Sequence, residues 1–194
     1  MKSPLWCALL LFLAGSTPAS RAAATPAFEE LFNGHDLSGW HHQDGPALDG
    51  KTDAADGRWT VRDGAIQANA EKERVLLWTT RSFPKNFVLR IEFRAAVRTD
   101  SGIFFKNVQL QCGDFATYAY KQLKAFKPQD WNVIEVTVQD GSARCTCNGE
   151  LMEAALKIPA DFGQLAIEAG RNAIEYRKIS LRPLPEAKEV TGAK

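Results

Sequence analysis

Three short stretches of the sequence carry polar side chains at every second position. In residues 87–94 these are Arg90, Glu92 and Arg94, and the next two stretches extend the set with Phe104, Lys106, Gln109 and Gln111. Amide and guanidinium groups can hydrogen-bond neighbouring hydroxyls of a sugar, and an aromatic ring can cover an apolar sugar face. If the three stretches are neighbouring strands, the set forms one sugar-binding face. The alternative is the solvated side of an antiparallel sheet, with Arg90 and Glu92 in ordinary cross-strand pairs.

The familiar catalytic motifs are absent from the sequence. It contains no GxSxG, HExxH, phosphate-binding glycine-rich loop or CxxC pair, which disfavours the enzyme classes that depend on them. The three histidines, His35, His41 and His42, lie in residues 33–57, a segment rich in Gly, Asp and His that we expect to be a long surface loop. His41 and His42 could contribute to a metal site or contact a sugar, but solvated loop histidines are commoner.

The elements that must position the polar set are β-strands. Period-two alternation recurs throughout the sequence, and no helical period extends beyond about two turns. In the clearest strand, residues 87–94, one face is polar and the other is apolar through Phe87, Leu89, Ile91 and Phe93. Hairpin turns are predicted at Asp63-Gly64, Asp140-Gly141 and Asn148-Gly149. About a dozen short strands at this spacing predict an all-β fold of two packed antiparallel sheets.

The first 24 residues have the pattern of a secretory signal peptide. Lys2 precedes an apolar run from Leu5 to Ala14, and small residues follow through Ala24. The run is shorter than the roughly 20 residues that a membrane-spanning helix needs, so we expect cleavage near residue 24 and no membrane span. This predicts a secreted or periplasmic protein, with one domain over residues 25–185 and a disordered tail over 186–194.

The composition is that of an ordinary soluble domain. The chain has 194 residues, 45% hydrophobic and 24% charged, with 24 Lys and Arg against 23 Asp and Glu. Because Lys2 and Arg21 lie in the predicted signal peptide, 22 basic and 23 acidic side chains remain after cleavage, a net charge of −1. This balance gives no electrostatic reason to expect nucleic acid or an anionic membrane surface as a partner.

Three cysteines follow the predicted signal peptide. Cys145 and Cys147 lie two apart on a predicted strand, so they share a face but are too far apart to bridge easily. A disulfide between Cys112 and one of them is an alternative, whereas three small buried thiols are favoured.

A series of short motifs follows along the chain, beginning with FEELFNGHDLSGW at residues 28–40. The others are WTVRDG, NFVLRIEFR, SGIFFK, the WN and NG pairs, and IEYRKISL, at residues 59–64, 86–94, 101–106, 131–132, 148–149 and 174–181. This series resembles, in order, the LFNGKDLxGW, WxVxDG, NFxLRxEFR, NSGIFxR, EWN, NG and IEFRNIxI motifs of the 3-keto-disaccharide hydrolase domain family. The resemblance covers residues 28 to about 184, nearly the whole predicted mature chain.

The resemblance implies a concanavalin A-like jelly-roll β-sandwich whose concave sheet binds carbohydrate. It also implies an activity, because characterised relatives cleave glycosides already oxidised at C3, as hydrolases, lyases or hydratases. A C3 ketone acidifies the C2 proton, so a general base can drive elimination of the C1 substituent, after which water adds back. Such a site needs a base near C2, a donor or divalent metal ion at the ketone, and an acid at the leaving oxygen.

The sequence departs from the family pattern at several positions. Gln109 stands where the family has a Glu, and an amide cannot act as a general base. Lys106 replaces an Arg and lacks the planar fork of a guanidinium, while Glu168 stands where the family has an amide. Residues 113–129 form a shorter loop than the family's, which predicts a more open cleft.

These observations lead to three hypotheses. In the first, the protein cleaves 3-keto-glycosides, with Glu168 and Glu92 as candidate catalytic residues and a substrate-binding set of Arg94, Lys106, Gln109, Gln111 and Phe104. A divalent metal ion is the one cofactor that this chemistry suggests. In the second, the same face belongs to a non-catalytic carbohydrate-binding module. In the third, the domain is structural and its polar face is merely solvated.

Overall fold

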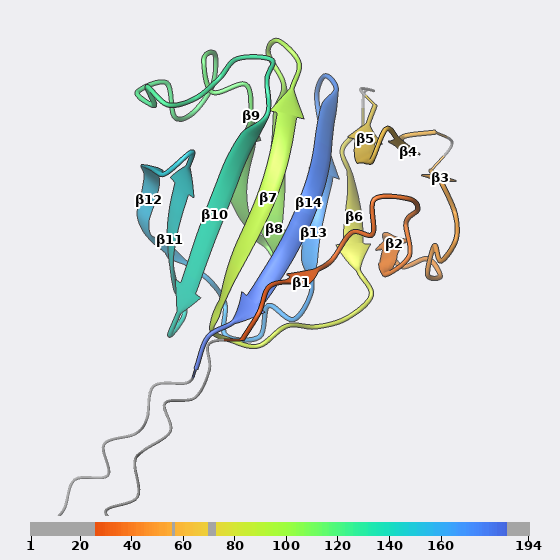
Figure 1. Ribbon diagram of the computed structural model, residues 1–194, viewed down its shortest axis with the longest axis horizontal. Helices are drawn as coiled ribbons and strands as arrows, with labels where there is room; N and C mark the ends of the chain where they lie inside the picture. Colours follow the sequence, from red (N-terminus) through yellow and green to blue (C-terminus); the bar gives the residue numbers. More distant parts are fainter. Residues whose placement is uncertain (1–25, 56, 70–72, 186–194) are drawn as a thin grey trace, which may run out of the picture.

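The computed structural model describes residues 26–55, 57–69 and 73–185, which fold into two antiparallel sheets packed face to face (Figure 1). The larger sheet has the order β12 (Glu150–Lys157), β11 (Ser142–Cys147), β10 (Asn132–Gln139), β7 (Phe87–Ala95), β14 (Ile174–Pro183), β5 (Ala65–Ala68), β4 (Trp59–Arg62) and β3 (Asp53–Ala54), and β1 (Glu29–Glu30) pairs with β14. The smaller sheet has the order β2 (Trp40–His42), β6 (Val75–Thr79), β13 (Leu165–Ala169), β8 (Asp100–Phe105) and β9 (Val108–Gly113).

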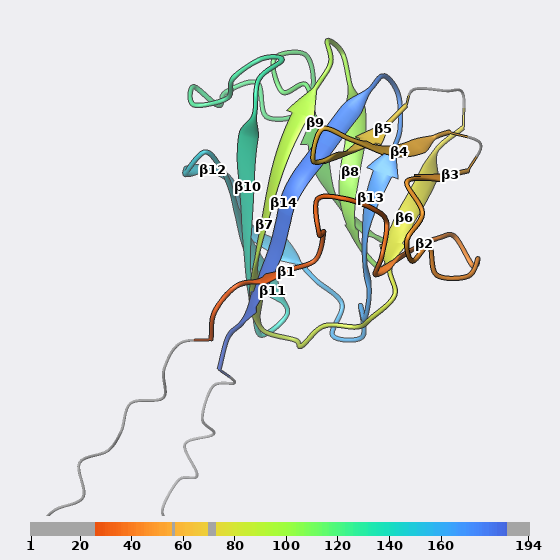
Figure 2. The same cartoon turned by 45° about the vertical axis from the view of Figure 1, so that its right-hand side comes forward.

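The two sheets form the layers of a concanavalin A-like jelly-roll β-sandwich. Figure 2 shows β10, β7 and β14 in one layer and β6, β13, β8 and β9 in the other. No helix occurs in the described ranges, and every pairing between strands is antiparallel. The predicted all-β fold of two antiparallel sheets is therefore confirmed.

Alternation along the strands builds the core between the sheets. The predicted apolar face of β7 is fully buried, through Phe87, Leu89, Ile91 and Phe93. Across the core, the ring of Phe105 on β8 stacks on that of Phe87 with 6.2 Å between the ring centroids, and Phe162 packs against both rings. Burying each such side chain contributes roughly 1.5–3 kcal/mol, so the aromatic contacts hold the two sheets in a fixed relation.

The three predicted hairpin turns form as expected. The residue pairs 63–64, 140–141 and 148–149 all have positive φ, between 49° and 84°. These are the backbone angles of the tight turns that match the right-handed twist of paired strands, and glycine adopts them at the second position without strain. They join β4 to β5, β10 to β11 and β11 to β12.

The condition for a single sugar-binding face, that residues 87–94, 102–106 and 108–112 form three neighbouring strands, is met only for the last two, because β8 pairs with β9 and β7 belongs to the other sheet. β7 lies between β10 and β14 in the larger sheet, whereas β8 lies between β13 and β9 in the smaller one. The short connection after β7 crosses from one sheet to the other, where Ala96 N–H bonds to Ala173 O and Asp100 N–H to Arg171 O. Alternation shows which side of a strand is buried, but it does not show to which sheet the strand belongs.

Residues 33–57 are more ordered than a surface loop. The described part of this segment contains β2 and β3, and it buries Leu37, Trp40 and Leu48 in the core. Two other predictions, the signal peptide at residues 1–24 and the tail at 186–194, lie outside the described residues. The described ranges contain no helix of the length and apolarity that crossing a membrane requires.

Cys112, Cys145 and Cys147 are free and buried, so the disulfide alternative is wrong and the favoured prediction of buried thiols is confirmed. Burial raises the pKa of the Cys145 and Cys147 thiols to about 12, which keeps both protonated. They act as small apolar side chains of the core.

Candidate functional site

The residues singled out from the sequence divide between the two outer faces of the sandwich. Glu92 and Arg94 alternate with core residues on β7 and therefore point outward from the larger sheet. The other predicted residues belong to the smaller sheet or its turns, namely Phe104, Lys106, Gln109, Gln111 and Glu168. Because the core lies between the two sheets, one ligand cannot contact both groups, and the prediction of a single shared face is wrong.

The outer face of the larger sheet carries a ladder of ion pairs, which we call the ladder face. Arg90 pairs with Glu135 at 2.7 Å, and Arg94 with Glu175 at 2.5 Å. Glu92 accepts from Arg177 at 2.7 Å and from Lys178 at 2.8 Å. The partners lie opposite in the strand register or next to it, so the alternative of ordinary cross-strand pairs is confirmed here.

Ion pairing determines the state of Glu92. Burial by itself would raise the pKa of this carboxyl, but hydrogen bonds from Lys178 and Arg177 outweigh it and lower the pKa. The guanidinium of Arg177 also lies 3.8 Å from the ring centroid of Trp131, and that of Arg94 lies 4.8 Å from it. Arg177 thus binds both the carboxylate of Glu92 and the ring of Trp131, which is the arrangement of a surface ion-pair network.

Lys106 belongs to a turn of the smaller sheet but does not contact the other predicted residues of that sheet. It occupies the turn between β8 and β9 with φ of 60°, and its Nζ pairs with Asp161 Oδ2 at 2.6 Å. The structure therefore does not bring Lys106 together with the other predicted residues of the smaller sheet.

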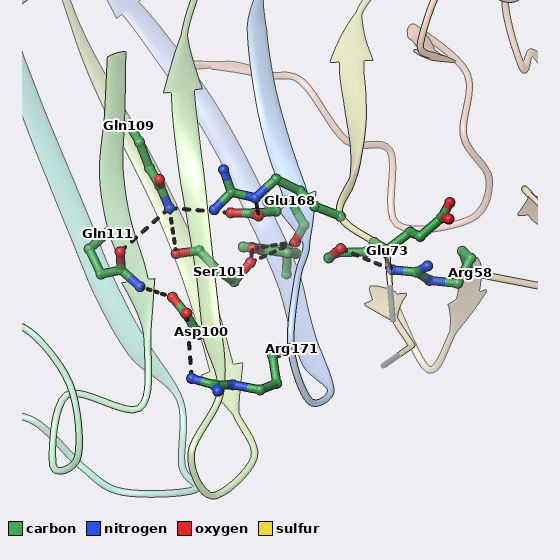
Figure 3. A network of polar contacts seen from close by, with 11 residues as sticks. Arg58, Glu73, Asp100, Ser101, Gln109, Gln111, Glu168 and Arg171 are labelled. Atoms are coloured by element: carbon green, nitrogen blue, oxygen red, sulfur yellow. Dashed lines mark hydrogen bonds and ion pairs between the residues drawn. The ribbon is translucent and has the colours of Figure 1, made fainter. Parts of the chain in front are cut away.

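The outer face of the smaller sheet gathers a chain of polar contacts around Glu168, which we call the site face (Figure 3). Gln109 Nε2 lies 3.3 Å from Glu168 Oε2 and 3.4 Å from Gln111 Oε1. Gln111 Nε2 donates to Asp100 Oδ1 at 2.6 Å, and Asp100 lies 3.6 Å from Arg171. Amides, carboxylates and a guanidinium thus converge on one face, as hydrogen bonding to a hydroxyl-rich ligand requires.

The strand register places these side chains together. β8 runs between β13 and β9, and Gly102 is opposite Gln111 while Phe104 is opposite Gln109. A Cβ at Gly102 would lie only 2.6 Å from Gln109 Nε2 and 2.7 Å from its Cγ. The missing side chain at Gly102 therefore leaves the space in which Gln109 crosses β8 to reach Glu168.

Aromatic side chains extend the site face beside the polar chain. Phe104 and Trp78 are the register partners of Ala166 from its two sides, and Trp78 is partly exposed. His41 pairs with Trp78 in the register, and its Nε2 lies 3.3 Å from Gln164 Nε2. A partly exposed ring on the same face as amides and carboxylates is a combination that suits a sugar, which has one apolar face and several hydroxyls.

Glu168 is the carboxyl group whose environment suits acid–base chemistry. Its side chain is only 1% exposed although it lies on an outer face, and its Oε1 is ion-paired with Arg74 Nε. Burial raises the pKa of Glu168 to about 7, helped by the charge of Asp100 and opposed by that of Arg74. A carboxyl that changes protonation near neutral pH can both accept and donate a proton at working pH.

Core contacts hold the backbone of Glu168. Ser101 Oγ donates to Glu168 O at 2.7 Å, and Tyr176 Oη donates to the same oxygen at 3.1 Å. Arg58, which is 5% exposed, donates to the carbonyls of Glu73 and Ala169. Arg58 thereby ties Ala169, which follows Glu168, to Glu73, which precedes Arg74. Figure 3 shows the contact between Arg58 and Glu73.

Sequence reasoning missed Arg58, Arg74, Asp100 and Arg171, because none of them lies on the polar side of a predicted strand. The sequence does contain one signal for the site. A glycine inside a strand, here Gly102, often marks the close approach of another group, which in this structure is the side chain of Gln109.

A divalent metal ion does not fit the described part of the site. Nowhere in residues 26–55, 57–69 and 73–185 do three His, Cys, Asp or Glu side chains lie close enough to hold one. The nearest groups to the Glu168 carboxylate are the cation of Arg74 and the amide of Gln109.

Several solved structures share this fold. A candidate glycosyl hydrolase from Parabacteroides distasonis aligns with a TM-score of 0.60 and 17% identity, over 81% of this chain and 94% of its own. The carbohydrate-binding module CBM66 from Bacillus subtilis aligns with a TM-score of 0.51 and 7% identity, over 75% of this chain and 96% of its own. The exoplasmic/lumenal domain of VIP36, bound to Ca²⁺ and Man3GlcNAc, aligns with a TM-score of 0.53 and 10% identity, over 84% of this chain and 93% of its own.

The family is established by sequence. No curated protein matches the chain. The model of the 3-keto-alpha-glucoside-1,2-lyase-like domain, however, matches residues 27–182, which include every strand of both sheets except the last residue of β14. The chain is a carbohydrate-active protein that belongs to the 3-keto-alpha-glucoside-1,2-lyase-like domain family.

Proposed function

We propose that the protein cleaves 3-keto-glycosides on the site face, with Glu168 as general acid and base. The observation that carries the proposal is the buried, outward-facing carboxyl of Glu168, whose pKa is raised by burial to about 7. The family match supports the substrate class, because the domain is named for a lyase of 3-keto-alpha-glucosides.

The ionised Glu168 takes the proton from C2 of the oxidised sugar. The electron pair of the broken C2–H bond first forms an enolate with the C3 ketone and then the C1–C2 double bond, while the bond from C1 to the leaving oxygen breaks. The protonated Glu168 returns its proton to that oxygen, which restores the carboxylate. A carboxyl with a pKa near the working pH performs both transfers with little penalty in either direction.

The neighbours of Glu168 supply positioning and recognition. Gln109 holds the carboxylate in place from one side. Gln111, Asp100 and Arg171 form the polar end of the site face and are positioned to bind sugar hydroxyls. Trp78 offers a partly exposed ring for the apolar side of the substrate.

The proposal includes export from the cytoplasm. It is supported by the signal-peptide pattern of residues 1–24, with Lys2 before the apolar run from Leu5 to Ala14. A secreted or periplasmic location would place the protein among extracellular glycosides.

A second candidate is a carbohydrate-binding module without catalysis. It is favoured by the amide of Gln109, which stands where the family pattern has a Glu and cannot act as a second general base beside Glu168. The module hypothesis keeps the same face and predicts binding of the sugar with no bond cleavage.

The test is to incubate the purified protein with a chromogenic 3-keto-glucoside and with the unoxidised glucoside, in the presence and absence of divalent metal ions. We expect release of the chromophore from the 3-keto-glucoside alone. Glu168→Gln should lower kcat at least about 100-fold, the typical contribution of a general base. Glu92→Gln makes the same chemical change on the ladder face and should leave kcat unchanged.

Two results would contradict the enzyme. An unchanged kcat in Glu168→Gln would show that this carboxyl does not transfer the proton at the reacting bond. Absence of product under every condition, with binding of the 3-keto-glucoside detected by calorimetry, would establish the binding module instead.

A further inference from the structure

The Glu168 carboxylate faces outward from the sheet, yet its two oxygens are covered. Oε1 is ion-paired with Arg74 Nε, and Oε2 lies 3.3 Å from Gln109 Nε2. The guanidinium of Arg74 also lies 5.7 Å from the ring centroid of Phe104, another outward-facing side chain, which is only 8% exposed. The Arg74 side chain therefore extends across the site face over both residues.

The two groups of this ion pair differ sharply in exposure. The Glu168 side chain is 1% exposed, whereas that of Arg74 is 57% exposed. A long arginine side chain with more than half its surface in water can rotate into solvent without moving the core. Its backbone need not move either, because Arg58 holds the carbonyl of the preceding residue, Glu73, at 2.7 Å.

From this geometry we infer that Arg74 is a displaceable cap, a positioning residue that covers the Glu168 carboxylate in the free protein and must move aside before a ligand can reach it. Gln109, by contrast, reaches Glu168 from within the sheet through the space left by Gly102, so it can remain in place when a ligand binds. The inference about ligand entry rests on the proposed function, whereas the capping of Glu168 does not.

Displacement of Arg74 changes the basicity of the Glu168 carboxyl as well as its accessibility to a ligand. The charged and titratable groups that face Glu168 are Arg74 from the β6 side, Asp100 from β8, and Cys112 and Tyr176 from the core. Burial raises the pKa of both Cys112 and Tyr176 well above their ordinary values, so they stay neutral. Arg74 is thus the one group of these that favours the ionised carboxylate, and its departure makes Glu168 a stronger base.

Covalent labelling tests the cap without any substrate. The folded protein is treated with a water-soluble carbodiimide and glycine ethyl ester, and the extent of amide formation at each carboxyl is measured by peptide mass spectrometry. Glu168 should be protected in the unchanged protein and labelled severalfold more in Arg74→Ala, whereas Arg74→Lys, which keeps the cation, should restore part of the protection.

Arg171→Ala is the matched control. Arg171 is as exposed as Arg74 and lies on the same face, but it pairs with Asp100 rather than with Glu168. This variant should increase labelling of Asp100 and leave Glu168 protected. If Glu168 stays protected in Arg74→Ala while Asp100 responds to Arg171→Ala, other groups bury Glu168 and the cap is overturned.

Kinetics on the 3-keto-glucoside test the consequence for ligand entry. Arg74→Ala should lower KM and leave kcat nearly unchanged, because the ligand no longer competes with the guanidinium for the carboxylate. A raised KM would mean that Arg74 binds the ligand and would contradict the cap. Protection restored by Arg74→Lys with no cleavage in any variant would leave the cap intact and reject only the enzyme proposal.

Discussion

At the scale of single residues, environment rather than residue type separates the two candidate carboxyls. Glu92 accepts from two cations on the ladder face, and the net effect lowers its pKa. Glu168 is buried more completely, and the single ion pair with Arg74 does not offset that burial, so its pKa is raised to about 7. Of these two carboxyls, Glu168 is therefore the one whose pKa lies near neutral pH.

The raised pKa of Glu168 predicts a pH-dependent cost in stability. The folded value of about 7 exceeds the ordinary value of 4.5, so the folded protein binds the extra proton and its free energy of unfolding falls as pH rises from 4.5 to 7. The full effect is of order 3 kcal/mol. In urea titrations, Glu168→Gln should be more stable than the unchanged protein above pH 7, with the difference shrinking towards pH 5. A difference independent of pH would contradict the raised pKa.

At the scale of elements, the site depends on how three strands lie side by side. Alternation in the sequence predicts that Gln109 and Gln111 share the outer side of β9. It does not predict that β13 brings Glu168 next to β8, because that pairing joins residues far apart in the chain. For the same reason, alternation alone assigns Arg94 and Gln109 to one face, since the period of a strand carries no information about its sheet.

Gly102 is the position where this arrangement can be tested. A Cβ there would collide with the Gln109 side chain, so Gly102→Ala should push the amide off Glu168. We expect kcat to fall about tenfold, the value of one hydrogen bond of this kind. If Gly102 acts only through Gln109, the double variant Gly102→Ala with Gln109→Ala should be no worse than Gln109→Ala alone. Additive losses would contradict that route.

At the scale of the whole molecule, the two outer faces of the sandwich carry different side chains. The ladder face is a set of mutually paired charges, and the site face carries the outward carboxyl, the amides and the partly exposed ring of Trp78. The sequence was sufficient for the fold, because hairpin turns and alternation are local signals. It was insufficient to assign the polar side chains to the two outer faces, because residues such as Arg58 and Arg74 make their contacts only in the folded chain.

The division predicts that equivalent truncations on the two faces differ in effect. Arg94→Ala removes a half-exposed ion pair and should change stability by less than about 1 kcal/mol, with sugar binding unchanged. Gln111→Ala removes a hydrogen-bonding group of the site face and should weaken binding of a 3-keto-glucoside by about 2- to 10-fold. Calorimetry on both variants decides the matter, and weakened binding in Arg94→Ala would move the site to the ladder face.

If Glu168 transfers the proton in cleavage of a 3-keto-glycoside, the pH dependence of kcat/KM must follow the ionisation of this carboxyl. Because the base must be ionised in the free protein, kcat/KM should rise with pH and level off above the Glu168 pKa of about 7. In Glu168→Gln this rise should vanish together with most of the activity. An unchanged profile and rate in that variant would contradict the claim.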